Sequence, residues 1–276
     1  MKNHLLGFVL ATVVMSASSV GIGAQKTLTF GIVPQQAASK LATLWGPILK
    51  HLSEASGYDI VFQTAPDIPT FERRVLAGEY DIAYMNPYHF TVFNQRPGYR
   101  AMARQSEKRI KGIIVVRKDS PLTSLVELDG SKLAFPAPAA FAASVLPRSE
   151  LNQQGVHFEP MYVSSHDSVY RSVAKGLFPA GGGIQRTFDN VAPEVREQLR
   201  VLWTTKGYTP HAIAAHPAMD ADTFARVQQA LLGMNDSPEG RSLLAAIKFK
   251  GVEKAADTDW DDVRALQIDL LADMLK

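Results

Sequence analysis

Apolar residues in the first third of the chain follow strand and helix spacings in turn. Residues 27–33 alternate like a half-buried strand, and over residues 41–52 the apolar positions recur at helical spacing. Pro47 lies inside the second pattern, so it should kink that helix or mark its true start. Further predicted elements are strands at 58–63 and 80–84 and a helix at 70–77. Three strand–helix units in a row indicate a largely parallel sheet with helices on both faces.

A second set of elements follows the basic stretch 108–111, beginning with the apolar run 113–116. Its predicted strands are 133–135, 161–163 and 201–203, and its predicted helices are 139–153 and 167–175. A strand at 212–215 should return the chain to the first set, before helices near 222–234 and over 260–275. We therefore expect an α/β protein with two lobes, each a mixed sheet flanked by helices. Lobe 1 would comprise 25–110 and 208–276, and lobe 2 would comprise 111–207. Two chain crossings predict a ligand cleft between the lobes that closes by hinge motion.

The first residues have the composition of a secretory signal peptide. Lys2 supplies a positive charge, residues 5–15 form a short apolar run, and small residues lead to a cleavage position after Ala24. The apolar run is shorter than the roughly 20 residues that span a bilayer. We therefore expect residues 1–24 to be a signal peptide that is removed on export.

Composition narrows the compartment and the class of ligand. The chain has no cysteine, and export without disulfides is typical of a bacterial periplasm. Its 29 basic and 27 acidic residues give a net charge of +2, which offers no support for nucleic-acid binding. We expect a periplasmic monomer that binds a small molecule and needs no cofactor.

The third predicted strand ends in aromatic and amide side chains directly before a helix start. Asn86 is a good N-cap and Pro87 a good first helical residue. In open α/β sheets, ligands bind outside the carboxyl ends of strands, so Tyr84, Met85 and Tyr88 are candidates to line a crevice. A helix start alone explains Asn86 and Pro87, and ordinary packing at the strand end is an equal alternative for the tyrosines.

Three segments, in this order, resemble the phosphate/phosphite/phosphonate-binding periplasmic proteins of ABC transporters. They read EYDIAYMNPYHF (79–90), VVRKDSPLTSLVELDGSKLAF (115–135) and SSHDSVYRSVAKG (164–176). The resemblance covers nearly all of the mature chain. It implies the type II two-lobed binding-protein fold, no catalytic activity, and a captured solute that is passed to an ABC permease.

The resemblance breaks down at positions that hold the ligand in that family. Family members begin a helix with a Ser-Thr-Ser type cluster, whereas this chain has Ala140, Phe141 and Ala142 after the strand that ends at Phe135. A family acidic residue is replaced by Pro179. Three lost hydroxyl bonds at about 1 kcal/mol each would weaken the binding of a phosphonate by several kcal/mol. We therefore expect simple phosphonates to bind weakly, and the ligand to be a more apolar or less highly charged small anion.

His166 and Arg186 are the remaining candidates for polar contacts with a ligand. His166 matches a family histidine that faces the ligand. Ser164 and Asp167 have capping-box spacing, so packing beside a helix start is the alternative for His166. Arg186 follows three glycines, which allow close backbone approach and positive φ, and an arginine binds oxyanions through paired hydrogen bonds. A flexible loop with a solvated arginine is the alternative.

The residues expected to bind the ligand come from strand ends and helix starts of both lobes. They are Gln36, Tyr84, Met85, Asn86, Tyr88, Phe135, Ala140, Phe141, Ala142, His166 and Arg186, with Gln35 as a further candidate beside Gln36. The sequence contains no HExxH motif and no Gly-x-Ser-x-Gly elbow, so a metal site and a secreted hydrolase are weaker alternatives. A ligand-sensing partner of a histidine kinase stays open beside the importer subunit, because both use this fold.

Overall fold

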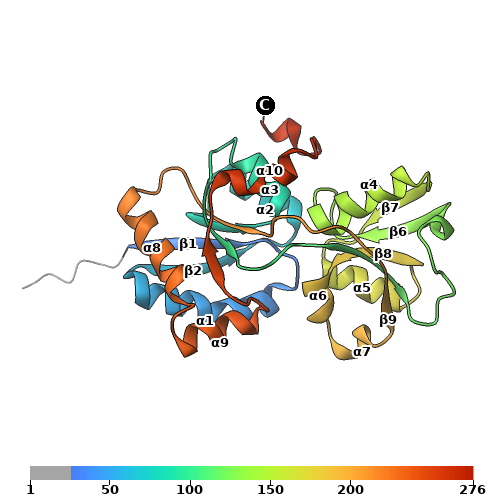
Figure 1. Cartoon of the computed structure of the whole chain (residues 1–276), viewed down its shortest axis with the longest axis horizontal. Helices are drawn as coiled ribbons and strands as arrows, with labels where there is room; N and C mark the ends of the chain where they lie inside the picture. Colours follow the sequence, from blue (N-terminus) through green and yellow to red (C-terminus); the bar gives the residue numbers. More distant parts are fainter. Residues whose placement is uncertain (1–25, 276) are drawn as a thin grey trace, which may run out of the picture.

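The structure is a computed structural model that describes residues 26–275 (Figure 1). The predicted signal peptide, 1–24, lies outside the described residues. Two separate sheets lie side by side along the long axis of the molecule, and helices flank each of them. The α/β class and the two-lobed plan are therefore confirmed.

The sheet of the first lobe has the strand order β11-β4-β10-β3-β1-β2. Its strands are β1 (Thr27–Ile32), β2 (Asp59–Thr64), β3 (Ile82–Met85), β4 (Arg100–Gln105), β10 (Ala212–Ala215) and β11 (Val252–Lys254). β1 pairs in parallel with β2 and β3, while β10 is antiparallel to both β3 and β4. The prediction of parallel pairing thus holds for the first three strands, and the later strands make the sheet mixed.

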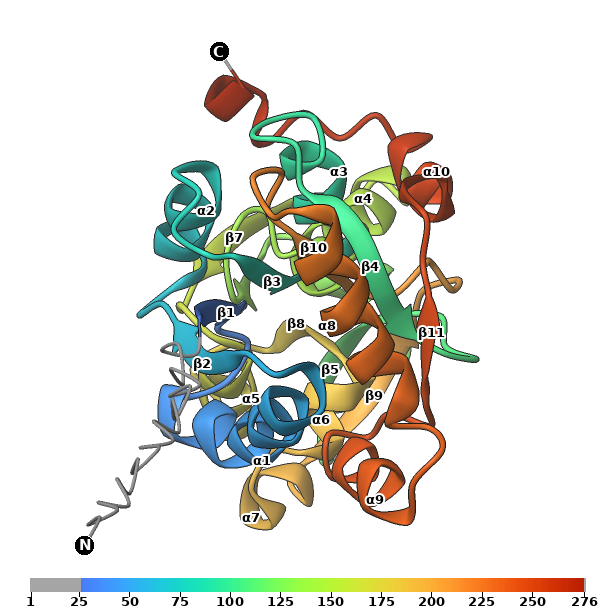
Figure 2. The ribbon, with the colours of Figure 1, turned by 90° about the vertical axis from the view of Figure 1, so that its left-hand side faces the viewer.

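Helices cover both faces of this sheet. They are α1 (Ala38–Ser56), α2 (Ile68–Leu76), α3 (Pro87–Phe93), α8 (Ala221–Gly233), α9 (Pro238–Ala246) and α10 (Asp261–Arg264). In both views α1 and α9 lie on one side of the sheet, and α2 and α3 lie on the other (Figure 2). Pro47 lies in the interior of α1, so it is not the start of that helix.

The sheet of the second lobe has the strand order β7-β6-β8-β5-β9. Its strands are β5 (Gly112–Arg117), β6 (Ser131–Phe135), β7 (Phe158–Tyr162), β8 (Ala180–Ile184) and β9 (Leu199–Thr204). Its helical segments are a π-helical turn (Phe141–Val145), α4 (Leu146–Gln153), α5 (His166–Ala174), α6 (Gln185–Asp189) and α7 (Pro193–Arg196). A short 3-10 helix, Val126–Leu128, precedes β6.

The chain crosses between the sheets twice, at residues 106–111 and 205–211, which we call the hinge segments. They run side by side, because Ile110 N donates to Tyr208 O at 2.7 Å and Tyr208 N donates to Ile110 O at 2.9 Å. The apolar core of the first lobe continues across the boundary into residues 139–143 of the second lobe. The two lobes therefore touch, and the structure is a closed conformation.

The predicted C-terminal helix over 260–275 is wrong. Helical structure is broken into a 3-10 turn at Asp257–Trp260, the short α10 and a 3-10 turn at Ala272–Leu275. Gln267 has a φ of 48°, a left-handed conformation that a continuous helix cannot contain. Trp260 is fully buried and its Nε1 donates to Pro210 O at 2.8 Å, so tertiary contacts hold this segment to the hinge. No helix within residues 26–275 combines the length and apolar character needed to cross a membrane.

Candidate ligand site between the lobes

Two stacked rings form the wall that the first lobe contributes. Tyr84 comes from β3, and His211 immediately precedes β10, which pairs with β3. Their ring centroids are 5.0 Å apart and the planes are inclined by 21°. Both side chains are buried, and burial raises the pKa of the Tyr84 hydroxyl. The wall is therefore a flat, neutral surface.

Arg186 faces this wall from the second lobe. It lies in the first turn of α6, directly after β8, and its guanidinium carbon is 5.7 Å from the Tyr84 ring centroid. An Arg186 Nη2 hydrogen bond to Gln35 Oε1 joins the lobes. Within residues 26–275, Arg186 forms no ion pair, so its positive charge is balanced only by a neutral acceptor and an aromatic ring.

Gln35 links three elements around the site. It follows β1, its Nε2 lies 2.7 Å from His211 Nε2, and its backbone carbonyl accepts from His166 N at 3.3 Å. The predicted neighbour Gln36 is also buried, but its side chain does not line either of the hollows described below. The sequence placed both glutamines after the first strand and gave no means of ranking them.

The two histidines of the site are neutral at neutral pH. Burial first, and the charge of Arg186 second, lower the pKa of His166 to about 3. The same two causes hold the pKa of His211 well below its usual value. His166 Nδ1 lies 3.1 Å from Thr187 Oγ1, a neutral partner. Arg186 is therefore the source of positive charge at this point between the lobes.

The helix start near His166 differs in detail from the prediction. Ser165, rather than Ser164, is the N-cap of α5, and its hydroxyl accepts from Ser168 N at 3.1 Å. Ser164 instead has a φ of 70°, which turns the chain just before the cap. His166 is the first residue of the helix, and its backbone amide reaches across to Gln35. His166 therefore packs at a helix start, as one alternative predicted, and its contact with a ligand stays a prediction.

A small inner hollow lies between the lobes, beside the start of the π-helical turn. Its wall includes Asn86 from the first lobe and Ala140, Phe141, Ala142 and His166 from the second. The space is about 10 Å³, which is room for one water molecule. In this closed conformation the hollow is therefore too small for a tetrahedral anion.

Asn86 has two roles at the edge of this hollow. Its Oδ1 accepts from His89 N at 2.8 Å, which confirms the predicted N-cap of α3. Its Nδ2 donates across the lobe boundary to Ala139 O at 3.3 Å. The helix start therefore accounts for half of its hydrogen bonds, and the contact between lobes accounts for the rest.

A larger cavity, which we call the hinge cavity, lies beside the first hinge segment. It has a volume of about 340 Å³, in the range of small-molecule sites. Its walls include Tyr84, Ile184, Arg186 and His211, together with the basic residues of the hinge, Lys108, Arg109 and Lys111. Of the residues that the structure describes, no aspartate or glutamate lines it.

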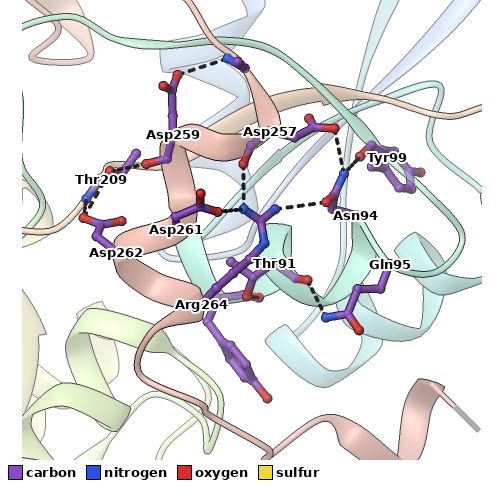
Figure 3. Close-up of polar contacts among 12 residues, drawn as sticks. Thr91, Asn94, Gln95, Tyr99, Thr209, Asp257, Asp259, Asp261, Asp262 and Arg264 are labelled. Atoms are coloured by element: carbon purple, nitrogen blue, oxygen red, sulfur yellow. Dashed lines mark hydrogen bonds and ion pairs between the residues drawn. The ribbon is translucent and has the colours of Figure 1, made fainter.

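A carboxylate of the C-terminal segment pairs with one of these cations. Arg109 forms an ion pair with Asp262 at 2.6 Å. Asp262 also accepts from Thr209 N at 2.9 Å (Figure 3). Arg264 extends the same network, donating to Asp261 Oδ1 at 2.7 Å and to Asn94 Oδ1 at 3.0 Å. The segment after β11 thus forms hydrogen bonds to both α3 and the second hinge segment, and its Asp262 neutralises the charge of Arg109.

Besides Gln36, three predicted site residues lie away from both hollows. Met85 is fully buried in the core of the first lobe. Tyr88 points toward the C-terminal segment, where its hydroxyl accepts from Leu271 N at 2.9 Å. Phe135 is in the core of the second lobe, with its ring centroid 6.1 Å from that of Phe158. We therefore do not carry Met85, Tyr88 and Phe135 into the proposed site.

The glycines before Arg186 form strand β8. The alternative of a flexible loop with a solvated arginine is therefore wrong. None of Gly181, Gly182 and Gly183 has positive φ, so the predicted conformational role is wrong. Close approach is confirmed, because a Cβ on Gly182 would lie 1.9 Å from Ala143 O, and one on Gly183 would lie 2.2 Å from the Tyr170 hydroxyl. The strand carries Arg186 to a defined place between the lobes.

Two α/β lobes, two hinge segments and a charged site between the lobes define a periplasmic binding protein of type II. Residues 30–260 match the family model described as "ABC transporter, phosphonate, periplasmic substrate-binding protein", and the chain belongs to that family. The family therefore indicates a small ligand, a membrane permease as partner and a periplasmic location.

Known proteins of low sequence identity share the family and the fold. The Phosphate-import protein PhnD of Mycolicibacterium smegmatis is 21% identical over 245 residues, which are 76% of this chain and 73% of that protein. A binding protein of an ABC phosphonate transporter from Pseudomonas aeruginosa superposes with a TM-score of 0.82 at 17% identity, covering 88% of this chain and 86% of that one. PhnD1 of Prochlorococcus marinus, solved with methylphosphonate, gives 0.80 at 19% identity and covers 87% and 97%.

Proposed function

We propose that this protein captures a small organic anion between its lobes and passes it to the permease of an ABC importer. Capture takes place in the periplasm, after a signal peptide is cleaved following Ala24. The protein acts as a monomer and does not transform its ligand. Importer rather than sensor is the role we assign, because the family is defined by ABC transport.

The observation that carries this proposal is the environment of Arg186. Burying part of a guanidinium without a counter-ion is unfavourable unless a charged partner arrives. Among the residues that the structure describes, Arg186 contacts only Gln35 Oε1 and the Tyr84 ring, and its charge adds to burial, which is the larger cause, in lowering the pKa of His166 and His211. An anionic group that replaces Gln35 at Arg186 supplies the missing charge.

Inorganic phosphate and simple phosphonates are not the ligands that we propose. One relative is named a phosphate-import protein and another was solved with methylphosphonate. In this chain the corresponding wall is Ala140, Phe141 and Ala142, so the hydroxyl bonds worth about 1 kcal/mol each are missing. Arg186 cannot replace three donors for a compact dianion, whereas it suits a carboxylate or one phosphonate group on a larger molecule.

The test combines calorimetry with small-angle scattering on a panel of anions that includes phosphate, methylphosphonate and small organic diacids. The tightest member should bind one to one without turnover and should reduce the radius of gyration. Arg186→Ala should weaken its binding by about 1.5–3 kcal/mol, the range for hydrogen bonds to charged groups.

Arg196→Ala is the matched control, because Arg196 is also half-buried in the second lobe and covers the Phe188 ring at 3.9 Å. It should leave affinity unchanged. If no anion in the panel binds or compacts the wild-type protein, the proposed function is wrong. Hydrolysis of a panel member would show instead that the protein is an enzyme.

A further inference from the structure

The hinge cavity has cations from two different elements. Arg186 comes from α6 of the second lobe, while Lys108 and Lys111 come from the first hinge segment. Arg109 is already paired with Asp262 and also donates to Thr209 Oγ1 at 3.1 Å. Lys108 and Lys111 are exposed and form no ion pair within the described part of the chain. Two sets of cations that have no counter-ion among residues 26–275 therefore face one space.

The rest of the wall is suited to a carbon skeleton. Tyr84 contributes an aromatic ring, and Ile110, Ile184 and Pro210 contribute aliphatic surface. Because no carboxylate among residues 26–275 lines the cavity, an ammonium group on the ligand would find no charged partner there. A zwitterion is disfavoured, and a molecule with acidic groups alone is favoured.

Size points in the same direction. The inner hollow, at about 10 Å³, is closed to a solute, whereas the hinge cavity has about 340 Å³. A single tetrahedral oxyanion held by Arg186 would leave most of that volume to water. A longer molecule fills the space and also reaches the second set of cations.

We infer that the hinge cavity, rather than the inner hollow, is the ligand seat, and that the ligand is an organic dianion with two separated acidic groups. One group is bound by Arg186 and the other by Lys108 and Lys111, with the carbon chain against Tyr84 and Ile184. This inference rests on the proposed function, because it specifies the anion that is captured.

The inference departs from the sequence-based expectation of a less highly charged ligand. That expectation considered only the lost serines and the lost acidic residue. The fold adds Lys108 and Lys111 to the site, because the first hinge segment forms one wall of the cavity. A dianion with its charges apart meets both sets of cations, whereas a compact dianion places both charges at one of them.

The test uses three phosphonates that differ only in the distal end of the chain. Ethylphosphonate has no second charged group, 2-aminoethylphosphonate has an ammonium, and 3-phosphonopropionate has a carboxylate. Calorimetry on the wild-type protein should give a dissociation constant for 3-phosphonopropionate about tenfold lower than for ethylphosphonate, the combined effect of two exposed charge pairs. 2-Aminoethylphosphonate should bind no better than ethylphosphonate.

The double variant Lys108→Gln/Lys111→Gln should remove that tenfold advantage, because it should weaken the binding of 3-phosphonopropionate about tenfold more than the binding of ethylphosphonate. Lys175→Gln is the control, since Lys175 is an exposed lysine at the end of α5. The advantage should also shrink as salt rises, because exposed charges are screened.

Three outcomes would overturn the inference that the ligand is a dianion. They are equal binding of 3-phosphonopropionate and ethylphosphonate, tightest binding of 2-aminoethylphosphonate, and an unchanged advantage of 3-phosphonopropionate in the double variant. The proposed function survives each of these if ethylphosphonate or another anion of the panel binds and depends on Arg186. If none of the three phosphonates binds, the inference of a dianionic ligand is wrong. The proposed function is then tested by the anion panel alone.

Discussion

One arginine and two buried histidines set the chemistry of the site at the scale of single residues. Arg186 keeps its charge, while burial and the proximity of Arg186 lower the pKa of His166 to about 3 and that of His211 well below the usual range. Low pH therefore does not readily supply a second cation in the closed conformation. An effect of His166 on binding should come from its position, rather than from an imidazolium that contacts the ligand.

The depressed pKa of His166 predicts how stability depends on pH. In the unfolded chain a histidine titrates near 6.5, so below that pH the unfolded state binds a proton that the folded state does not. The free energy of unfolding is therefore at its full value above pH 6.5. It falls as the pH drops toward 3, by about 1.4 kcal/mol per pH unit for one proton.

His166→Asn should reduce that slope by about one proton, while His211 keeps its own contribution. Asparagine places a polar atom near the position of Nδ1, which faces Thr187, so the variant should fold. Urea unfolding between pH 4 and 8 measures the slope. His157→Asn is the control, because the His157 side chain is 90% exposed, and its slope should stay near that of the wild-type protein. An unchanged slope in His166→Asn would mean that His166 is protonated in the folded protein.

Local sequence predicted the contacts of some candidate residues and not of others, and the difference has a physical cause. Asn86 was predictable because an N-cap is a local contact, here with His89 three residues later. Tyr88 was not, because its hydroxyl meets Leu271, which is 183 residues away in the sequence. Lys108 and Lys111 were visible as a basic stretch, but only the fold shows that they line the cavity.

Strand β8 is one of the elements that the sequence did not predict. A run of three glycines has low strand propensity, and it gives no alternation of apolar and polar side chains. The run is a strand because β5 and β6 flank it and because the π-helical turn and α5 pack directly against it. Glycine is required there because neighbouring atoms leave no room for a Cβ, and not because the backbone has a positive φ. Local sequence does not reveal such tertiary contacts.

This packing predicts opposite outcomes for two glycine-to-alanine substitutions. Gly182→Ala would place a Cβ 1.9 Å from Ala143 O and 2.7 Å from the Phe135 ring. The backbone of the π-helical turn or of β8 must shift, and overpacking of this kind destabilises by about 1–3 kcal/mol. Gly233→Ala, at the end of α8, would meet nothing within 4 Å and should stabilise by about 0.5 kcal/mol.

Urea unfolding of both variants at neutral pH measures these changes. Gly182→Ala should also weaken ligand binding, since β8 leads directly to Arg186. A Gly182→Ala protein as stable as the wild-type protein would contradict the tight packing of β8.

At the scale of the whole molecule, the alternation of strands and helices was sufficient to predict two α/β lobes and two crossings. The contacts that hold the lobes together were not predictable, because each joins segments remote in sequence. Three hydrogen bonds cross the boundary between the lobes: Asn86 with Ala139, Gln35 with His166, and Arg186 with Gln35. Failure of the predicted helix at 260–275 has the same cause, since its residues bind the hinge instead of continuing a helical ladder.

Gln35 connects the state of the lobes to the occupancy of Arg186. In the closed conformation its Oε1 accepts the hydrogen bond that an anionic ligand would otherwise take, and its Nε2 contacts His211 at 2.7 Å. A neutral amide is a weaker partner for a guanidinium than a carboxylate is, so a ligand can displace it. The identity of residue 35 should therefore set both ligand-free closure and affinity.

Gln35→Glu should turn this contact into a permanent ion pair. The carboxylate of Glu has nearly the same shape as the amide, but it neutralises Arg186 and competes with the ligand. We expect affinity for the tightest anion of the panel to fall by roughly 10–100-fold, which corresponds to a charge-assisted hydrogen bond of about 1.5–3 kcal/mol. The radius of gyration of the ligand-free Gln35→Glu protein should be equal to or smaller than that of the ligand-free wild-type protein, because the ion pair joins the lobes.

Gln35→Ala provides the contrast, because it removes the acceptor of the Arg186 hydrogen bond. The ligand-free Gln35→Ala protein should therefore have a larger radius of gyration, and its closed form should bind the anion at least as tightly as the closed wild-type protein. Calorimetry and small-angle scattering on the three proteins measure both quantities. Wild-type affinity in Gln35→Glu would show that the ligand does not need Arg186 to be free.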